Sequence, residues 1–537
     1  MQQVRSFWIF NGLALTADVE TMLVLAARPE VREIRQDHWR QWVEPFSTSG
    51  GQASLAGTDS QWSISHVRAD LAWKNLGLDG SGVTVAIMDT GVDGQHPALQ
   101  SQYRGYRPGG LSVHAGNWIC TTDEGYLYPV DPHGHGTHVA GTAVGSQDDA
   151  YQAIGVAPGA NWIGVKILDD AGYAYDSWIH AGFEWIMAPD GNPALAPDVV
   201  NGSWGSQSDT DEAFRPDLQA LRAAGIAPIF AAGNEGPYTS SLRSPASYPE
   251  AIAVGATDDQ DQVARFSSRG PSPWHEIKPE VTAPGVQIHS SLPGGTSGVK
   301  NGTSMAAPHV TGIVALMLQA DPTLTVENIE SILTSTAVPL DIQLPNNNSG
   351  WGRVDAYSAA AVALQAGFLV GQVTRLPDQQ PLPTAFVTAQ SELGEHQATV
   401  AVDETGHYQL ALPAGRFSVK ATAFGYEAQT IAAVEIQATL TQTLQFQLQP
   451  APAGVLWGQV TDNDTGGPVS VLVSVPGTPA STTSDAQTGQ YSLPLPAGAY
   501  TVEIAQNGYR RLRVPRVDIV TGQATRLDLS VSPAPTL

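Results

Sequence analysis

The stretch VTVAIMDTG at residues 83–91 decides how the centre of this chain folds. It is a nearly continuous apolar run ending in an acid and a glycine, which is typical of a strand buried on both faces of a parallel sheet. Between this stretch and its later counterparts lie segments with helical apolar spacing, such as SWIHAGFEWIM and FRPDLQALRAAG. We therefore predict an α/β fold with a doubly wound, mostly parallel sheet that helices cover on both faces. The other predicted strands are WIGVKIL (162–168), DVVNGSWG (198–205), APIFAAGN (227–234) and AIAVGATD (251–258).

Three of these predicted strands end in polar residues, which are Asp89, Ser203 and Asn234. Ligands of open parallel sheets bind at the carboxyl ends of the strands, so these side chains are candidates for a functional site. A carboxylate at Asp89 could orient an imidazole, and the amide of Asn234 could donate to an oxyanion. Taken singly, each residue is better explained as part of a turn.

Three histidines, His133, His135 and His138, lie within the stretch DPHGHGTHVAGT at residues 131–142. The small residues after His135 predict a tightly packed helix that starts near it, which leaves its ring free to project toward the ligand side. His138 falls inside this helix and is expected to pack against the core. A zinc site is the alternative, but the spacing lacks the usual ligand pattern and the chain has no cysteine pair.

The stretch NGTSMAAPHVTGIVALML at residues 301–318 predicts a turn followed by an apolar helix that begins at Ser304. Pro308 is expected within the first turn or so, where a missing N–H costs little. A serine at a helix start has an exposed hydroxyl and lies where the helix dipole favours negative charge, as an acyl-transfer nucleophile requires. The alternative role is an ordinary N-cap.

Together these motifs resemble the subtilisin-like serine proteases (subtilases, peptidase family S8), over residues 60–366. The resemblance implies that Asp89 orients the base His135, that Ser304 is the nucleophile and that Asn234 stabilises the oxyanion of an acyl-transfer reaction. It also implies substrate binding by four residues: Ser203, Trp204, Gly205 and Gly233. The matching motifs are MDTGVDGQHP, HGTHVAGT, NGSWGS, AAGNEGP, FSSRGP and NGTSMAAPHV.

Two departures from the family pattern affect the site. Ala98 stands where many subtilases have a calcium-binding aspartate, so a structural calcium is possible but not supported, and no metal ligands are predicted. The acyl-transfer chemistry that the resemblance implies requires no cofactor. The insertion at residues 103–131 resembles that of bacillopeptidase F-like subtilases. Arg243, in SSLRSPASYP, is expected to approach the pocket for the residue before the cut, which predicts tolerance of acidic side chains there.

The flanking regions differ in texture from the centre. Residues 1–45 predict a strand pair around Asn11–Gly12, a helix and a short strand VREIRQ at 31–36, and they resemble the second half of a subtilase propeptide inhibitor domain. A Ser/Gly-rich linker at 46–61, expected to be cut during maturation, precedes the catalytic domain at 62–366. Beyond it, TGHYQLALPAGRFSV recurs as TGQYSLPLPAGAYTV, which predicts two β-sandwiches at 367–450 and 453–537 that resemble carboxypeptidase regulatory-like, transthyretin-like modules.

Composition narrows the classes of partner. The 51 acidic and 26 basic residues give a net charge of -25, which repels phosphate backbones, so no nucleic-acid partner is expected. The single cysteine, Cys120, cannot form an internal disulfide. No apolar run predicts a membrane span, and no signal-peptide pattern opens this chain.

Three functions remain open from the residues alone. The leading hypothesis is a secreted, monomeric serine endopeptidase that acts on proteins or peptides, in which localisation and substrate class follow from the resemblance. The second is an inactive subtilase scaffold that presents the repeat modules as a surface-binding protein. The third is a metal-dependent hydrolase that uses the histidine cluster.

Overall fold

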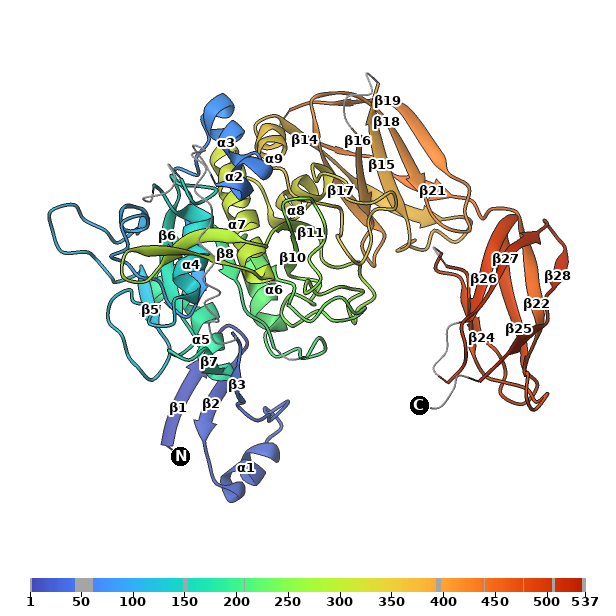
Figure 1. Cartoon of the computed structure of the whole chain (residues 1–537), viewed down its shortest axis with the longest axis horizontal. Helices are drawn as coiled ribbons and strands as arrows, with labels where there is room; N and C mark the ends of the chain where they lie inside the picture. Colours follow the sequence, from blue (N-terminus) through green and yellow to red (C-terminus); the bar gives the residue numbers. More distant parts are fainter. Residues whose placement is uncertain are drawn as a thin grey trace. The chain divides into compact units, whose positions relative to one another are not determined.

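The computed structural model describes residues 2–43, 61–147, 153–206, 208–392, 397–438, 440–476, 478–504 and 508–533. Residues 46–60 of the predicted linker therefore lie outside the described residues. The chain forms two compact units, Met1–Ala366 and Gly367–Leu537. In Figure 1 the first unit runs from blue to yellow and mixes helices with strands, whereas the second, in orange and red, consists of strands.

The centre of the first unit is a seven-stranded sheet, counted over the described residues. Its order is β11-β10-β9-β8-β4-β6-β5, and neighbouring strands pair in parallel throughout. The predicted fold class is thus confirmed. The strands are β4 (Thr84–Asp89), β5 (Trp118–Cys120), β6 (Asn161–Lys166), β8 (Val199–Gly202), β9 (Ala227–Ala231), β10 (Ile252–Thr257) and β11 (Val281–Pro284).

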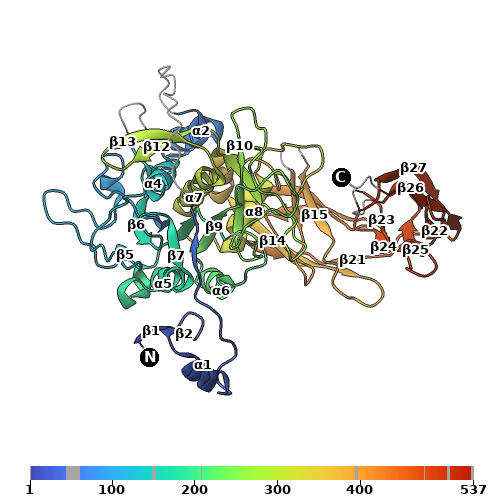
Figure 2. The ribbon, with the colours of Figure 1, turned by 60° about the horizontal axis from the view of Figure 1, so that its bottom comes forward.

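Helices cover both faces of this sheet, with α5 and α6 on one side and α4 and α7 on the other (Figure 2). Ala86 and Met88 belong to the core cluster beneath α5 and α6. Because side chains alternate along a strand, Ile87 and Asp89 face the side of α4 and α7. The helices are α2 (Trp62–His66), α3 (Ala69–Leu71), α4 (His135–Val144), α5 (Asp176–Met187), α6 (Arg215–Ala223), α7 (Thr303–Ala320), α8 (Val326–Ser335) and α9 (Ala356–Ala363).

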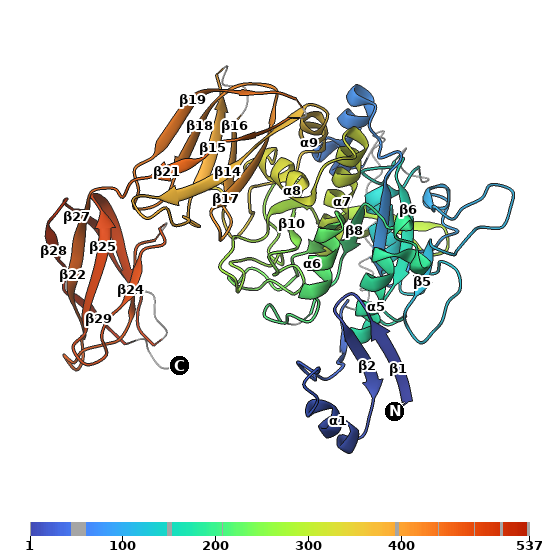
Figure 3. The ribbon, with the colours of Figure 1, turned by 180° about the vertical axis from the view of Figure 1, so that it is seen from behind.

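The N-terminal region contains the predicted hairpin and helix, as β1 (Gln2–Phe7), β2 (Gly12–Thr16) and α1 (Val19–Ala26). The hairpin lies beside α5, as Figure 3 shows. The predicted strand at residues 31–36 is wrong, because these residues have no strand partner. β3 (Trp39–Gln41) forms the strand pairing instead, and it runs antiparallel to β7 (Tyr173–Tyr175).

A hairpin of β12 (Ile288–Leu292) and β13 (Thr296–Lys300) packs against α4 and leads into α7. α7 is the longest helix within the described residues, at 18 residues. No helix in this described part is both long and apolar enough to cross a membrane.

Each half of the second unit contains two small sheets around its own apolar core. The strands of the first half are β14 (Ala366–Arg375), β15 (Phe386–Ser391), β16 (Gln397–Ala401), β17 (His407–Pro413), β18 (Gly415–Thr422), β19 (Gln429–Ile436), β20 (Thr441–Thr443) and β21 (Phe446–Leu448). Those of the second half are β22 (Ala453–Asp462), β23 (Leu472–Ser474), β24 (Ser481–Thr483), β25 (Gln490–Pro496), β26 (Gly498–Ile504), β27 (Leu512–Ile519), β28 (Ala524–Arg526) and β29 (Leu529–Val531).

The sequence repeat of these two halves has a local structural cause. A Cβ atom on Gly458 would lie 1.9 Å from the carbonyl oxygen of Leu527, so only glycine permits this approach. The same carbonyl accepts a hydrogen bond from the hydroxyl of Tyr491 at 2.6 Å. Gly371 and Tyr408 make the equivalent contacts with the loop carbonyl of the first half. The recurring GQVT and TG-x-Y motifs therefore secure one loop in each module.

Candidate active site

Asp89 and His135, which are 46 residues apart in the chain, meet above the end of β4. The Nδ1 atom of His135 lies 2.7 Å from Oδ1 of Asp89, and both side chains are buried. Asp89 also accepts from the N–H of Thr90, so its turn role and its contact with the histidine coexist. A carboxylate on Nδ1 fixes the tautomer and leaves Nε2 as the atom that can accept a proton.

His135 stands at the start of α4 because a buried network organises the turn before it. Asp131 accepts hydrogen bonds from the N–H groups of Gly134 and Thr137, and from the hydroxyls of Thr137 and Thr90. Thr90 in turn accepts from the N–H of Gly136. Burial raises the pKa of Asp131, and these hydrogen bonds oppose that rise. Sequence reasoning missed Asp131, although it opens the same histidine motif and lies four residues before the helix start.

Lys166 fixes the position of Thr90, the residue that follows Asp89. The buried ammonium of Lys166, at the end of β6, donates to the carbonyls of Thr90 and Leu168 at 2.8 Å each. It also forms an ion pair with Asp170 at 3.0 Å. A buried lysine with such partners fixes the backbone that carries Asp89.

The other two histidines are separated from the base by their environments. His138 is fully buried inside α4, as predicted, and its Nε2 faces the carbonyls of Ile288 and Gly298. Burial lowers the pKa of His138, and burial together with the neighbouring His135 lowers the pKa of His133 to about 4. Both rings are thus uncharged at neutral pH, so they add no second positive charge beside His135.

Ser304 is the second residue of α7, and Gly302 occupies the N-cap, so Ser304 is not the cap. Its hydroxyl donates to the carbonyl of Ser203 at 3.1 Å. In return, the hydroxyl of Ser203 donates to the carbonyl of Ser304 at 2.9 Å. This second bond has a clear cause in Pro308, whose missing N–H would otherwise bond the Ser304 carbonyl. Pro308 is the sixth helical residue and so lies in the second turn, just beyond the first.

Asn234, after β9, is oriented toward the start of α7. Its Oδ1 accepts from the N–H and the hydroxyl of Thr303, at 3.0 Å each, which leaves the amide nitrogen as the donor. A Cβ atom on Gly302 would lie 3.7 Å from this nitrogen and 3.6 Å from the N–H nitrogen of Ser304. The two donors therefore flank the same small space, which glycine keeps clear.

The structure thus places the predicted catalytic residues in two groups. Asp89 and His135 are bonded at the start of α4, whereas Ser304, Ser203 and Asn234 gather at the start of α7. These two helices, α4 and α7, pack on each other. Gly312 permits the close approach, because a Cβ atom at this position would lie only 2.9 Å from the carbonyl oxygen of Ala143.

Comparison with known proteins identifies the family. The model of the subtilase family matches residues 80–352, which is more than half of the chain. The chain belongs to the subtilase family. The carboxypeptidase regulatory-like domain matches residues 369–449 and again 455–532. This peptidase family makes the chain a serine-type endopeptidase by class.

Its relatives are bacterial proteases. Bacillopeptidase F of Bacillus subtilis (strain 168) is 42% identical over 435 residues, which cover 77% of this chain and 29% of the relative. Subtilisin E of the same strain is 36% identical over 63% of this chain and 78% of the relative. Subtilisin BL of Lederbergia lenta is 38% identical over 56% of this chain and 97% of the relative. This subtilase therefore spans under a third of bacillopeptidase F.

The predicted substrate-binding residues of this subtilase belong to the segments that follow β8 and β9, beside Ser304. Trp204 is buried, its indole N–H donates to the carbonyl of Met88, and its ring meets that of Trp42 edge-on at 5.6 Å. Gly205 and Gly233 both lie against the side chain of Arg243. Trp204 is thus part of the apolar core, in addition to being a predicted substrate-binding residue.

Ala98 stands where many subtilases have a calcium-binding aspartate. Ala98 is fully buried, and its carbonyl accepts from the N–H and hydroxyl of Ser146. Its methyl group offers no ligand to a cation. Within the described residues, no group of three or more His, Cys, Asp or Glu side chains is arranged to hold a metal ion.

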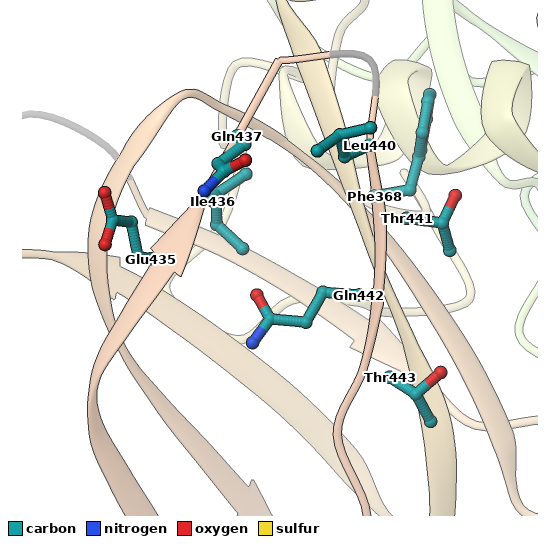
Figure 4. A pocket seen from close by; sticks show the side chains of 8 residues that line it. All are labelled: Phe368, Glu435, Ile436, Gln437, Leu440, Thr441, Gln442 and Thr443. Atoms are coloured by element: carbon teal, nitrogen blue, oxygen red, sulfur yellow. The ribbon is translucent and has the colours of Figure 1, made fainter.

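A shallow cavity of about 540 Å³ lies in the first β-module, between the end of β19 and β20 (Figure 4). In Figure 4 the side chain of Gln442 extends across it, and Glu435 stands on the facing strand. The lining holds no nucleophile paired with a base. Its residues are Phe368, Glu435, Ile436, Gln437, Leu440, Thr441, Gln442 and Thr443.

Proposed function

We propose that this subtilase hydrolyses peptide bonds of proteins through an Asp89–His135–Ser304 triad and an acyl-enzyme. The observation that carries the proposal is the buried 2.7 Å contact between Asp89 and His135, next to a helix whose N-terminal turn holds Ser304. Nucleophile, base and oxyanion donors all come from the chain, so the proposed chemistry needs no cofactor. The hydrogen bond from the Ser304 hydroxyl to the carbonyl of Ser203 is compatible with it, since a single neutral hydrogen bond of this kind is weak enough to be exchanged when substrate binds.

In the first half-reaction, the hydroxyl oxygen of Ser304 attacks the peptide carbonyl carbon while Nε2 of His135 takes its proton. The resulting oxyanion accepts from the Asn234 amide and from the N–H of Ser304, which has no intrahelical acceptor at its position in α7. Asp89 stabilises the imidazolium. The carbon–nitrogen bond then breaks, and His135 gives its proton to the leaving amine.

In the second half-reaction, water attacks the ester on Ser304 and His135 takes its proton. A second oxyanion forms in the same space beside Gly302. When it collapses, the bond to Ser304 breaks, His135 returns the proton to the serine, and the new carboxylic acid leaves.

We also propose that the N-terminal region is a propeptide that covers the substrate side until residues 46–61 are cut. β3 runs antiparallel to β7, and the N–H groups of Trp42 and Val43 both donate to the carbonyl of Gly172. A Cβ on Gly172 would lie 3.5 Å from His133, two residues before the proposed base. N-terminal sequencing of the active enzyme tests this, and an active chain that retains Met1 would refute it.

A fluorophosphonate probe, which labels activated serines, tests the catalytic proposal. Labelling and peptide hydrolysis should both be lost in Ser304→Ala. Ser177→Ala is the matched control, because Ser177 is likewise the second residue of a helix, α5, and should leave both unchanged. Folded protein without label would support an inactive scaffold that acts as a surface-binding protein. Hydrolysis that a chelator stops, with no label, would support a metal-dependent hydrolase.

Secretion and action as a monomer remain proposals that rest on the family. Detection of the processed chain in culture medium, and its mass in sedimentation, would test them.

A further inference from the structure

Two chain segments flank Ser304 and must therefore enclose a bound substrate. One follows β8 and includes Ser203, whose carbonyl accepts from the hydroxyl of Ser304. The other follows β9 and includes Asn234, whose side chain accepts from Thr303. A peptide carbonyl placed against Ser304 lies between these segments, so the side chain of the same residue enters the space that they border.

The side chain of Arg243 lies across the end of that space. Its backbone N–H donates to the carbonyl of Ala232 at 3.1 Å. A Cβ atom on Gly205 would lie 2.9 Å from Cβ of Arg243, and one on Gly233 would lie 2.8 Å from Cγ of Arg243. The stem of Arg243 therefore touches both segments, and the two glycines are what give it room.

The charge of Arg243 is held in place rather than left to swing in solvent. Its Nε lies 3.1 Å from Oε2 of Glu235, and the same oxygen accepts from the hydroxyl of Ser268 at 3.1 Å. The side chain of Arg243 is only 25% exposed. A guanidinium carries five N–H donors, so one contact, such as that of Nε with Glu235, does not use all that it can donate to a carboxylate.

We propose that Arg243 ends the pocket for the substrate residue whose carbonyl is attacked, and selects glutamate or aspartate there over lysine or arginine. The inference rests on the proposed triad. Glu235 alone would attract a basic side chain, but its pairing with Arg243 neutralises it. An acidic substrate side chain meets the guanidinium in a partly desolvated pocket, where a charge-assisted bond is stronger than in water.

The test uses three peptide p-nitroanilides that differ only in the last residue, which is Glu, Phe or Lys. The wild-type enzyme should cleave the Glu peptide with a higher kcat/KM than the Lys peptide. In Arg243→Ala, the ratio of kcat/KM for Glu to that for Phe should fall by about 10–100-fold, as expected for the loss of a charged hydrogen bond. The Glu:Lys ratio should reverse in the same variant, because Glu235 is then unpaired.

Two further variants keep the test informative if the alanine variant folds poorly. Arg243→Lys keeps the positive charge but loses the planar guanidinium that can donate two parallel N–H bonds to a carboxylate, so it should give an intermediate Glu:Phe ratio. Glu235→Gln removes the negative charge beside the guanidinium and should raise the Glu:Lys ratio above that of the wild type. Arg215→Ala is the matched control, because Arg215 also pairs through Nε with a glutamate, Glu250, at 3.1 Å and is 26% exposed. It should leave every ratio unchanged.

An enzyme that cleaves the Phe peptide but rejects Glu and Lys equally, before and after Arg243→Ala, overturns this inference while the triad stands. Loss of the Glu preference in the Arg215→Ala control as well would also overturn it, since the effect would then be unspecific. A wild-type chain that neither cleaves any of the peptides nor takes the fluorophosphonate label would instead refute the proposed function itself.

Discussion

Asp89 and His135 on one side of the site, and Ser304 and Asn234 on the other, are held by different kinds of bonds. On the first side, a buried carboxylate on His135 is backed by a second one, Asp131, which accepts four hydrogen bonds. On the second side, neutral hydroxyl, carbonyl and amide groups bind one another between α7 and the ends of β8 and β9.

This difference matches what each side does in the proposed reaction. His135 must gain and lose a positive charge without moving, which fixed negative charge and a rigid turn favour. The Ser304 hydroxyl must leave one acceptor and attack a carbonyl carbon, which a single neutral hydrogen bond of modest strength permits. The comparison predicts that removing negative charge impairs the first side, and that removing a hydroxyl or amide group impairs the second.

The largest effect is expected from Asp89→Asn. An amide in this place stabilises the wrong tautomer of His135 and cannot balance the imidazolium, so kcat should fall by about 10⁴-fold, the effect known for this change in other triad proteases. Steady-state hydrolysis of the Phe peptide, with circular dichroism to verify the fold, measures it. A loss below about 10-fold would mean that buried charge is not what makes His135 a base.

Asn234→Ala should lower kcat by about 10²–10³-fold with little change in KM, as when the equivalent donor is removed from a subtilisin. The reason is that the amide donates to the oxyanion, which exists only in the transition state and intermediates. Steady-state kinetics separates the two constants. A rise in KM with unchanged kcat would instead place Asn234 in ground-state binding.

We expect acid to destabilise α7, the helix that carries Ser304, by protonating His309. His309 is fully buried in α7, and its Nδ1 lies 2.8 Å from the carbonyl oxygen of Met305. Burial lowers the pKa of His309 to about 4. Its folded-state pKa lies below the unfolded value of about 6.5, so its contribution to stability is present above pH 6.5 and is lost as the pH falls toward 4. The loss should amount to about 3 kcal/mol.

Urea unfolding between pH 7 and pH 4 measures this loss, with Ser304→Ala as the background to prevent self-digestion. His309→Asn keeps a donor for Met305 but does not titrate, so its stability should decline less over the same range. Equal slopes for the two proteins would show that another group is responsible.

Asp131→Asn should lower kcat by about 10–100-fold, because misplacing a catalytic ring by a fraction of an ångström has effects of this size. The amide nitrogen of asparagine is a donor and cannot accept from the N–H groups that Asp131 now binds. Asp93→Asn is the control, since Asp93 also accepts from backbone N–H groups, those of Gln95 and Gly294, and should change kcat by less than about 3-fold. Equal losses in both variants would contradict a special role for Asp131.

Ser203→Ala should have the smallest effect on activity, because the carbonyl that faces Ser304 remains. It should destabilise the fold by about 1–3 kcal/mol by leaving the Ser304 carbonyl without a donor. Pro308→Ala restores an N–H at the position that bonds this carbonyl, so the double variant should regain much of the loss in chemical denaturation. Strict additivity of the two changes would refute the explanation of the Ser203 bond.

Local patterns were sufficient to predict where most of the site lies. The apolar run of β4 predicts a strand with Asp89 at its end, and the small residues after His135 predict a helix that starts there. Both predictions are confirmed, and so is the parallel sheet. The roles of Asp131 and Pro308 could not be predicted in this way, because their partners Thr90 and Ser203 lie 41 and 105 positions away.

In the N-terminal region, a local pattern predicted an element that the structure does not contain. Strand propensity alone predicted a strand at residues 31–36, but a strand exists only where another offers its N–H and C=O groups. That partner is β7, and it takes up β3 instead.

The sequence by itself determined the elements and the residue types at their ends, because hydrophobic periodicity and capping act over a few neighbouring residues. Tertiary structure alone decided which of these ends meet: Asp131 with Thr90, Ser203 with the carbonyl that Pro308 leaves unbonded, and Arg243 with Gly205 and Gly233. Such contacts depend on how β4, β8, β9 and the two helices pack, and no local pattern of residues records that packing.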